Sequence, residues 1–441
     1  MMILLKNVHV LNPLINLMGE NVDILIDDSK IKAIGENIVN NDALIINAGN
    51  KIAVPGLVDV HVHFRQPGQE HKETIYTGSR AAAAGGFTSV VTEPNTSPPI
   101  DTVSRIKELL KIAENQSIVK FYTKACITEH SKGERLTRIR DLKDAGAAAV
   151  SDDGNPVPDE DLMGKALEES ARCGILVSPH CEESEFYRQK MSQRNLPVSP
   201  IPYNSEVEFV RRDIALAEKA GARIHISHVS LAESVKEIAG AKKRGVAVTA
   251  EAAPQHFILT EKDAKEIGTN AKVNPPLRSA EDVAAIKSGL ADGTIDIIAT
   301  DHAPHSPQEK AVPWEQAPFG LIGLETSLGL VLTYLVQPGI LTLSQAIAKM
   351  STIPAKIFGL PVHEIAEGQP ADLTLIDLEQ KWTVDADKFY SKGRNCPFNG
   401  WQLQGKAFMT IVNGRIVMQD GRIIPPPLLK GGRGGLLFPN I

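Results

Sequence analysis

Two histidines and an arginine follow one apolar run in the stretch GLVDVHVHFRQPG, residues 56–68. Alternate residues of a strand share a face, so the side chains of His61, His63 and Arg65 should point the same way. One interpretation is structural, with core histidines and a salt-bridged arginine. The other is chemical, because imidazoles gathered on one face are a ligand set for zinc and related metals. The other histidines of the chain decide between the two.

Polar residues stand at the ends of several more apolar runs. These strand-end residues, with the first pair included, are His61, His63, Asn95, Asp152, Asp153, His180, His228, Asp301, His302 and His305. Six of the 12 histidines belong to this set, which favours a functional site over scattered core histidines.

Imidazoles and carboxylates without thiolates suit Zn, Mn, Fe or Co in a hydrolytic site. Four histidines and two aspartates are enough for two metals that share a bridging carboxylate. Cys181 is a ligand by type, but it adjoins His180 in the chain and should point to the opposite face. We therefore expect Cys181 to pack in the core.

The elements that must position these residues repeat a pattern of helix, glycine and apolar strand. The helix-ending glycines are Gly86, Gly146, Gly174, Gly221, Gly245 and Gly293. With the run at 57–63 and the segment VKFYTKACITE, the pattern predicts eight strands between residues 55 and 302. Eight such units match a (β/α)8 barrel, in which functional residues lie at the carboxyl ends of the strands. A doubly wound open sheet is the alternative, but no G-x-G-x-x-G turn follows the first strand.

The flanks of the barrel, residues 55–360, have a different pattern. Residues 1–54 and 361–424 contain short strand-like runs separated by Asn, Asp and Gly. We expect them to form one small β-domain from both chain ends, with the barrel inserted between them. Residues 425–441 are rich in Pro and Gly and are expected to form a loosely ordered tail.

The composition excludes several classes of protein. The chain has 441 residues, a net charge of −6 and a pI near 6.1, so nucleic acid is not an expected partner. No apolar run approaches the ~18 residues of a membrane-spanning helix, and the N-terminal run is too short for a signal peptide. Four scattered cysteines indicate neither a zinc knuckle nor a disulfide framework. A cytoplasmic protein is expected.

Several motifs together resemble those of one enzyme family. They are DVHVHFRQPG, EPNTSPP, SDDG, PHCEE, HISHVS, KVNPPLR, ATDHAPH and APFGLIGLET. This set is similar to that of the dihydroorotases of the amidohydrolase superfamily, in the long class I form found as a separate bacterial polypeptide. The resemblance runs from about residue 50 to the segments GQPADLTLID and TIVNG, and so covers nearly the whole chain.

The resemblance implies an amidohydrolase barrel with a β-sandwich domain made from both termini. It also implies reversible interconversion of L-dihydroorotate and N-carbamoyl-L-aspartate in pyrimidine biosynthesis, by a zinc-bound hydroxide with an aspartate proton shuttle. Two Zn²⁺ ions per subunit are expected. By motif, His61 and His63 resemble ligands of the first zinc, His180 and His228 ligands of the second, Asp153 the bridging carboxylate, and Asp301 a ligand that also shuttles the proton. Substrate-binding residues implied in the same way are Arg65, Asn95, Asn274, His305, Phe319 and Gly320.

Three positions depart from the usual family motifs. Gln66 stands where glutamate is usual, but it should face away from the ligands. TEPNT replaces CMPNT, which keeps Asn95 but changes the neighbouring residues that hold it in place. EAAPQH replaces a T-P-H-H motif, so we expect His256 to be structural or to support the site from behind. His225 is also expected to be structural.

Two kinds of alternative remain open. Dihydropyrimidinases, hydantoinases and allantoinases share H-x-H, but they typically bridge their metals with a carboxylated lysine where this chain has VSDDG. The nearest strand-end lysine here is Lys124, after the third predicted strand. A catalytically silent scaffold for aspartate carbamoyltransferase is the other alternative, although such proteins lack ligand histidines that this chain has. A homodimer is expected, and a complex with aspartate carbamoyltransferase is compatible with an active enzyme.

The connection between His305 and Phe319 is long and has no periodicity. Loops longer than about 12 residues in a compact domain are usually functional or mobile. We expect this loop to close over the substrate, so that backbone groups of the segment APFG meet the ring.

Overall fold

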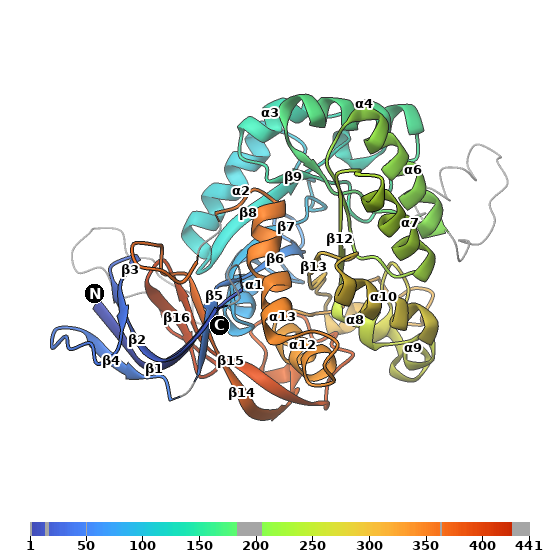
Figure 1. Ribbon diagram of the computed structural model, residues 1–441. Helices are drawn as coiled ribbons and strands as arrows, with labels where there is room; N and C mark the ends of the chain where they lie inside the picture. Colours follow the sequence, from blue (N-terminus) through green and yellow to red (C-terminus); the bar gives the residue numbers. More distant parts are fainter. Residues whose placement is uncertain (1, 14–16, 50, 183–204, 362–363, 426–441) are drawn as a thin grey trace.

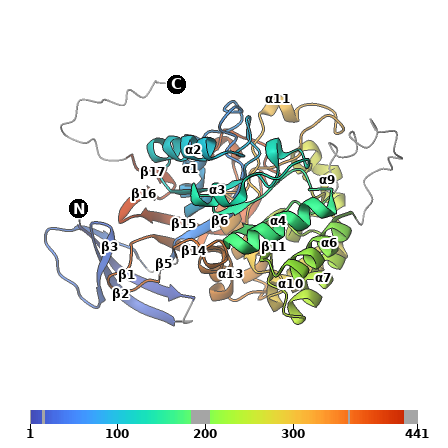
Figure 2. The ribbon, with the colours of Figure 1, turned by 90° about the horizontal axis from the view of Figure 1, so that it is seen from above.

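The computed structural model describes residues 2–13, 17–49, 51–182, 205–361 and 364–425. Its larger part is a nearly closed barrel of eight parallel strands surrounded by helices (Figures 1 and 2). In order around the barrel, the strands are β6 (Leu57–Val62), β7 (Phe87–Thr92), β8 (Lys120–Ala125), β9 (Ala149–Val150), β10 (Leu176–Val177), β11 (Ile224–Ile226), β12 (Val248–Ala252) and β13 (Ile297–Ile298). Every residue of β6 and β7 is buried, in line with the mainly apolar and β-branched residues of these strands. The predicted eight-stranded barrel is therefore confirmed.

The barrel closes between its first and last strands. Val62, at the end of β6, pairs in parallel with His302, which follows β13. The backbone N–H of His63 donates to the carbonyl of His302 at 2.8 Å. Residues 61–63 and 301–305, far apart in the sequence, therefore lie side by side at the carboxyl ends of the strands.

Helices cover the outside of the barrel, and glycines end many of them. All six glycines predicted to follow helices have positive φ, a backbone conformation that residues other than glycine rarely adopt. The described α-helices are α1 (Ile75–Ala84), α2 (Val103–Gln116), α3 (Ile139–Asp144), α4 (Glu160–Cys173), α6 (Ser205–Ala220), α7 (Ala232–Lys243), α8 (Pro254–Ile258), α9 (Glu261–Ile267), α10 (Ala280–Asp292), α11 (Pro307–Lys310), α12 (Ser327–Val331), α13 (Leu343–Met350) and α14 (Thr352–Ile357).

Both ends of the chain contribute to a second, mixed sheet of nine strands (lower left of Figure 1). Its strands are β1 (Met2–Asn12), β2 (Leu17–Asp27), β3 (Lys30–Gly35), β4 (Leu44–Asn47), β5 (Ile52–Pro55), β14 (Leu373–Thr383), β15 (Gln402–Val412), β16 (Arg415–Gln419) and β17 (Arg422–Ile423). Strand β5 pairs with β1 on one side and with β14 on the other, so it joins the two chain ends. The expected tail at 425–441 lies outside the described residues except for its first residue.

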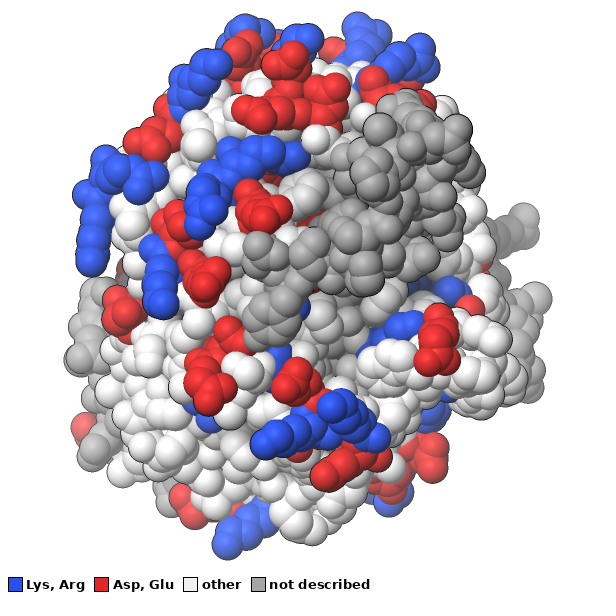
Figure 3. Space-filling model, turned by 90° about the vertical axis from the view of Figure 1, so that its right-hand side faces the viewer, with Lys and Arg blue, Asp and Glu red and all other residues white. Residues whose placement is uncertain are grey.

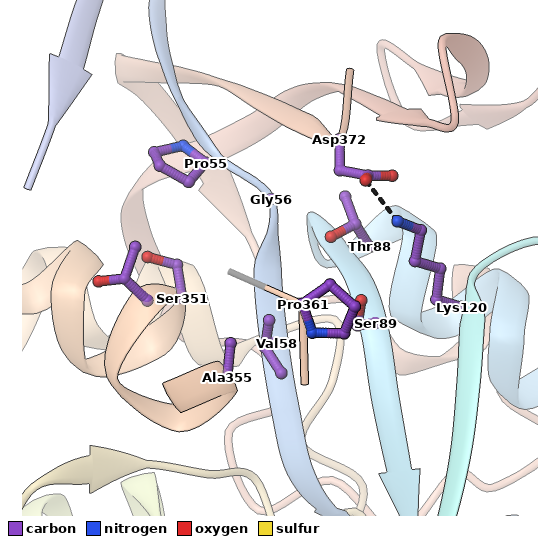
Figure 4. Close-up of a pocket in the computed structure, with 11 residues that line it drawn as sticks. Pro55, Gly56, Val58, Thr88, Ser89, Lys120, Ser351, Ala355, Pro361 and Asp372 are labelled. Atoms are coloured by element: carbon purple, nitrogen blue, oxygen red, sulfur yellow. Dashed lines mark hydrogen bonds and ion pairs between the residues drawn. The ribbon is translucent and has the colours of Figure 1, made fainter. Parts of the chain in front are cut away.

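The amino end of the barrel is closed by apolar residues and by contact with the mixed sheet. Phe358, which follows α14, packs with Val60, Val91 and Ile297 of the barrel interior. Lys120 at the start of β8 forms a 2.5 Å ion pair with Asp372, which precedes β14 (Figure 4). The cavity beside this pair is only about 20 Å³. This end is therefore tightly filled.

None of the helices that the structure describes is both long and apolar enough to cross a membrane. Basic and acidic side chains are interspersed over the face shown in Figure 3. Among the described residues of that face, basic side chains form no continuous stripe.

Candidate metal and active site

Residues from the first and last strands form one cluster of candidate metal ligands at the carboxyl end of the barrel. Asp301 Oδ1 lies 3.1 Å from His63 Nε2 and 3.6 Å from His61 Nε2. One ligand atom from each of these three residues lies within 4.8 Å of the other two. The closure of the barrel between β6 and the segment after β13 brings them together.

A second cluster lies beside the first. Asp153 Oδ1 is 3.4 Å from Nε2 of both His61 and His228. One ligand atom from each of these three residues also lies within 4.8 Å of the other two. His180 Nδ1 lies 3.0 Å from His228 Nε2 and 3.7 Å from Asp153 Oδ1. All six predicted ligands therefore lie in one buried group. His61 belongs to both three-residue clusters, whereas the sequence suggested only Asp153 as the shared group.

The charges of this group stabilise one another in the absence of a metal. Burial alone would lower the pKa of His61, but Glu93, Glu251 and Asp153 raise it well above its usual value. Burial alone would raise the pKa of Asp153, but the imidazoles of His180, His228 and His61 beside it lower it well below its usual value. A metal ion bound here would take the place of the imidazolium charge, since ligand histidines bind as neutral rings.

The residues fit divalent metals by chemistry and by their unmet hydrogen bonds. Buried atoms without a hydrogen-bond partner among the described residues include His61 Nε2 and Asp153 Oδ1, both directed into the group. Such orphan atoms normally cost free energy unless water or an ion satisfies them. Imidazole and carboxylate ligands without thiolate suit zinc, manganese, iron or cobalt. The two clusters are consistent with a binuclear metal site.

A glutamate behind the ligands orients one of them. Glu251, in β12, lies 2.5 Å from His61 Nδ1 and 3.1 Å from His225 Nε2, while its Oε1 also accepts the backbone N–H of His228. A hydrogen bond from Nδ1 directs the other ring nitrogen of His61 toward the metal site. Sequence reasoning missed Glu251, although a carboxylate within a buried barrel strand was a signal. His225 contacts Glu251 and Thr249 and not the ligand group, in line with the structural role expected of it.

An open cavity of about 130 Å³ lies over the ligand group. Its lining includes five of the six predicted substrate-binding residues, namely Arg65, Asn95, Asn274, Phe319 and Gly320. The sixth, His305, lies behind the wall and contacts Arg65 and the carbonyl of Phe319. The structure therefore brings the predicted ligands and the predicted substrate-binding residues together at the carboxyl end of the barrel.

The guanidinium group of Arg65 is held at the wall of this cavity. Its Nε donates to the carbonyl of Pro304 at 3.3 Å, and Nη2 lies 3.3 Å from His305 Nε2. Burial and the neighbouring cations, Arg65 first among them, lower the pKa of His305 to about 2. A neutral His305 donates from Nε2 to the carbonyl of Phe319 at 2.8 Å. Arg65 can therefore offer its other N–H groups to an anionic substrate.

The two asparagines of the cavity both contact predicted ligands. Asn95 Oδ1 lies 2.9 Å from His63 Nδ1, and its Nδ2 donates to Asp153 Oδ2 at 3.2 Å. Asn274 Nδ2 lies 3.0 Å from His180 Nε2. Both side chains thus orient the metal-ligand group, a function that sequence reasoning did not assign to them.

Two buried lysines, Lys272 outside the loop and Lys310 within it, hold the loop from His305 to Phe319. Lys272 Nζ donates to the carbonyls of Trp314 and Glu315 at 2.6 and 3.3 Å. Lys310 Nζ donates to the carbonyl of Pro318 within the loop at 2.8 Å and to the carbonyl of Lys272 outside it at 3.4 Å. The loop also contains the short helix α11. These contacts hold the loop beside the cavity, and its expected closure over substrate stays a prediction.

Three site residues have backbone conformations unusual for their type. Arg65, His228 and Asp301 have φ values of +58°, +34° and +50°. Non-glycine residues seldom adopt positive φ, and such strain tends to gather at functional sites. The surrounding fold therefore holds these side chains in place at some cost in backbone energy.

Four further residues take up positions apart from the metal ligands. Gln66 accepts the N–H of Ile75 at the start of α1, so it faces away from the ligands as expected. His302 turns toward Glu73, His256 lies 3.0 Å from the carbonyl of Pro275, and Cys181 is buried in the core.

Comparison with known proteins is consistent with this geometry. The sequence model of the family described as Dihydro-orotase-like matches residues 50–234, and that of the Amidohydrolase family matches residues 211–417. The chain is 48% identical to a dihydroorotase of Pelotomaculum thermopropionicum, over 95% of this chain and 99% of that protein. It is 44% identical to a dihydroorotase of Acetivibrio thermocellus, with the same coverage.

Solved structures of related enzymes share the architecture. An L-hydantoinase (dihydropyrimidinase) from Arthrobacter aurescens superimposes with a TM-score of 0.85 at 30% identity, covering 96% of this chain and 97% of that one. A dihydropyrimidinase from Brevibacillus agri gives 0.84 at 25% identity, covering 96% of each chain. Together with the curated relatives, they show that this chain belongs to the dihydroorotase family of the amidohydrolases and is a cyclic amide hydrolase.

Proposed function

We propose that this enzyme interconverts L-dihydroorotate and N-carbamoyl-L-aspartate, using two zinc ions, in cytoplasmic pyrimidine biosynthesis. One observation carries the proposal: Arg65 and the six candidate ligands lie together at the carboxyl end of the barrel, at and beneath one cavity. A guanidinium group is the natural partner for the carboxylate beside the reacting ring. The dihydroorotases among its relatives support this substrate.

The candidate ligands divide between two metals in this proposal. His61, His63 and Asp301 would hold one metal, His180 and His228 the other, and Asp153 would bridge them. Bound divalent metals supply Lewis acidity and a water of lowered pKa.

Asp301 moves the proton in the proposed reaction. Burial raises its pKa, but the hydrogen bond to His63 and the nearby imidazoles lower it overall, so the carboxylate is ionised near neutral pH. An ionised Asp301 can accept a proton from the attacking water and return it to the departing amide nitrogen. Arg65 holds the substrate carboxylate, and the loop that carries Phe319 shields the ring from solvent.

A hydantoinase-type activity is the second candidate, because solved hydantoinases have the same fold. The bridging place here holds Asp153, and Lys124 is already engaged by Glu93 and Ser178. These contacts favour dihydroorotate over hydantoin. The presence of all six ligands argues against a silent scaffold. A homodimer and a complex with aspartate carbamoyltransferase remain part of the proposal.

The test is metal analysis combined with hydrolysis assays on dihydroorotate, hydantoin, dihydrouracil and allantoin. We expect about two equivalents of zinc and turnover of dihydroorotate well above the other three. Faster turnover of any other substrate would overturn the proposed substrate. Metal-replete protein without any activity would instead support a scaffold.

A further inference from the structure

One buried ion pair beneath the candidate ligands has no part in the mechanism above. Glu93 follows β7 and Lys124 lies in β8, and both side chains are completely buried. Lys124 Nζ donates to Glu93 Oε1 and, at 3.1 Å, to Ser178 Oγ. Ser178 Oγ in turn lies 2.9 Å from Ser227 Oγ. Lys124 is therefore well satisfied by hydrogen bonds.

Glu93 faces the candidate metal ligands. Its Oε1 lies 3.5 Å from His61 Nε2. The same nitrogen lies 3.4 Å from Asp153 Oδ1 and 3.6 Å from Asp301 Oδ1. Three carboxylates thus surround the ring nitrogen of His61 that Glu251 directs into the site.

Three residues of this group each have one polar atom with an unmet hydrogen bond. Glu93 Oε2, His61 Nε2 and Asp153 Oδ1 are all buried and lack a hydrogen-bond partner among the described residues. Leaving a buried carboxylate oxygen unpaired is costly, more so when the group is charged. Lys124 occupies only Oε1 of Glu93. A cation bound by His61 Nε2 and Asp153 Oδ1 would lie beside the Glu93 carboxylate, whose Oε1 is 3.5 Å from His61 Nε2.

A purely structural pair is the alternative. Buried ion pairs add little stability compared with well-packed apolar residues, because both charges must leave water. The surroundings would suit such residues, since the Lys124 ammonium lies 5.4 Å from the centre of the Phe358 ring. A structural role also leaves the second oxygen of Glu93 unexplained.

We propose that Glu93 is a further carboxylate of the metal centre on the side of His61, and that Lys124 is the positioning residue that holds it there. The inference rests on the proposed binuclear site and adds to it a ligand that none of the predicted roles includes. Lys124 also offsets the negative charge that a third carboxylate brings to this side.

Metal binding, and not turnover, tests this inference. The full-length enzyme is stripped of metal and titrated with Zn²⁺ against a chromophoric chelator, and with Co²⁺ by visible absorption. In Glu93→Gln, one of the two equivalents should bind about 10–100-fold more weakly, the range seen when groups supporting a metal are removed. The Co²⁺ spectrum of that equivalent should also change.

Two variants separate a metal role from a structural one. Glu93→Met with Lys124→Met removes both charges, so it should fold and show the same weakened equivalent even if Glu93→Gln does not fold. Lys124→Met alone should lower the Tm of the metal-free protein. It should also enlarge the Tm gain on adding Zn²⁺, because the unpaired carboxylate gains more from a cation.

The matched control is the ion pair at the opposite end of β8. Lys120→Met with Asp372→Asn should leave both metal equivalents unchanged. If the Glu93 and Lys124 double variant also binds both equivalents with unchanged affinity and spectrum, the pair is structural and the inference is wrong, while the proposed function stands. An unmodified enzyme that binds no divalent metal would overturn both.

Discussion

Strand β8 carries a lysine near each end, and the two lysines differ in their ion-pair partners and in the residues around them. Lys120, at the amino end, forms an ion pair with Asp372 across the boundary to the mixed sheet (Figure 4). Lys124, near the carboxyl end, pairs with Glu93 beneath the ligand group. At the amino end, apolar side chains fill the interior. At the carboxyl end, Asp153 and Asp301 join Glu93 around the imidazoles.

The difference shows that the amino end of the barrel contributes mainly to stability and the carboxyl end mainly to chemistry. Acidic groups at the carboxyl end outnumber the fixed cations near them, and buried ring and carboxylate atoms are left without hydrogen bonds. Arg65, His228 and Asp301 also hold positive φ there. Changes at this end should therefore affect activity, whereas changes at the amino end should affect the free energy of unfolding.

Metal removal should have the largest effect. Chelation should abolish turnover, because the ligand group has no other source of Lewis acidity. It should also lower Tm, since a ligand that binds only the folded state stabilises it. Readdition of Zn²⁺ should restore both, as followed by activity and scanning calorimetry. Full activity in metal-free protein would contradict a catalytic role for metal at the carboxyl end of the barrel.

Asp301→Asn should lower kcat by roughly 10²–10⁴-fold, the usual contribution of general acid–base catalysis. Metal content and substrate binding should be retained. Measurement of kcat, metal stoichiometry and the dissociation constant of a substrate analogue checks this. If metal is lost in proportion to the rate, Asp301 is mainly a ligand.

Arg65→Met should reduce kcat/KM by roughly 10–100-fold, since a hydrogen bond to a charged group is worth about 1.5–3 kcal/mol. Most of the effect should appear in KM, because Arg65 holds a carboxylate that does not react. Arg65→Lys should recover only part of the loss, as an ammonium lacks the planar fork. An unchanged KM for both variants would contradict the assigned contact.

Lys120→Met should act on stability alone. Breaking a fully buried pair costs about 3–5 kcal/mol and an exposed one less than about 1 kcal/mol. The Lys120 side chain is 20% exposed, so we expect a loss of about 1–3 kcal/mol in the free energy of unfolding. Urea unfolding measures the loss, and kcat/KM should not change. A large drop in kcat/KM would mean that the two ends are coupled.

Lys272→Met should have the smallest effect. Losing its hydrogen bonds to the loop carbonyls should raise KM by roughly fivefold to tenfold, the equivalent of about one buried hydrogen bond. Hydrogen exchange in residues 306–318 should quicken in this variant. In the unmodified enzyme, dihydroorotate should slow that exchange if the loop closes over substrate. Equal exchange with and without ligand would contradict closure.

Much of the fold followed from local patterns in the sequence. Glycines at helix ends need positive φ, and strands buried on both faces need apolar residues, so both features can be recognised without a partner. The convergence of the six candidate ligands followed from the rule that barrel sites lie at the carboxyl ends of strands. Hydrogen-bonded pairing in β9, β10 and β13 covers only two residues each, shorter than their apolar runs suggest.

Residues that act through a partner were not predictable in the same way. Glu93 and Lys124 were visible as an altered motif and a strand-end lysine, but only the folded barrel places them in contact. Asn95 was assigned to the substrate by motif, yet its two polar atoms contact His63 and Asp153. Pairings of this kind depend on packing between elements distant in sequence, which periodicity does not encode.

The contact between Val62 and His302 also has a consequence for biosynthesis. The ligand group spans residues 61–301, so it cannot assemble on the ribosome until the last barrel strand has been made. Contacts of such large sequence separation form late and slowly during folding. Uptake of both metals should therefore require a chain that extends past residue 301, and chains truncated before it should not bind both ions.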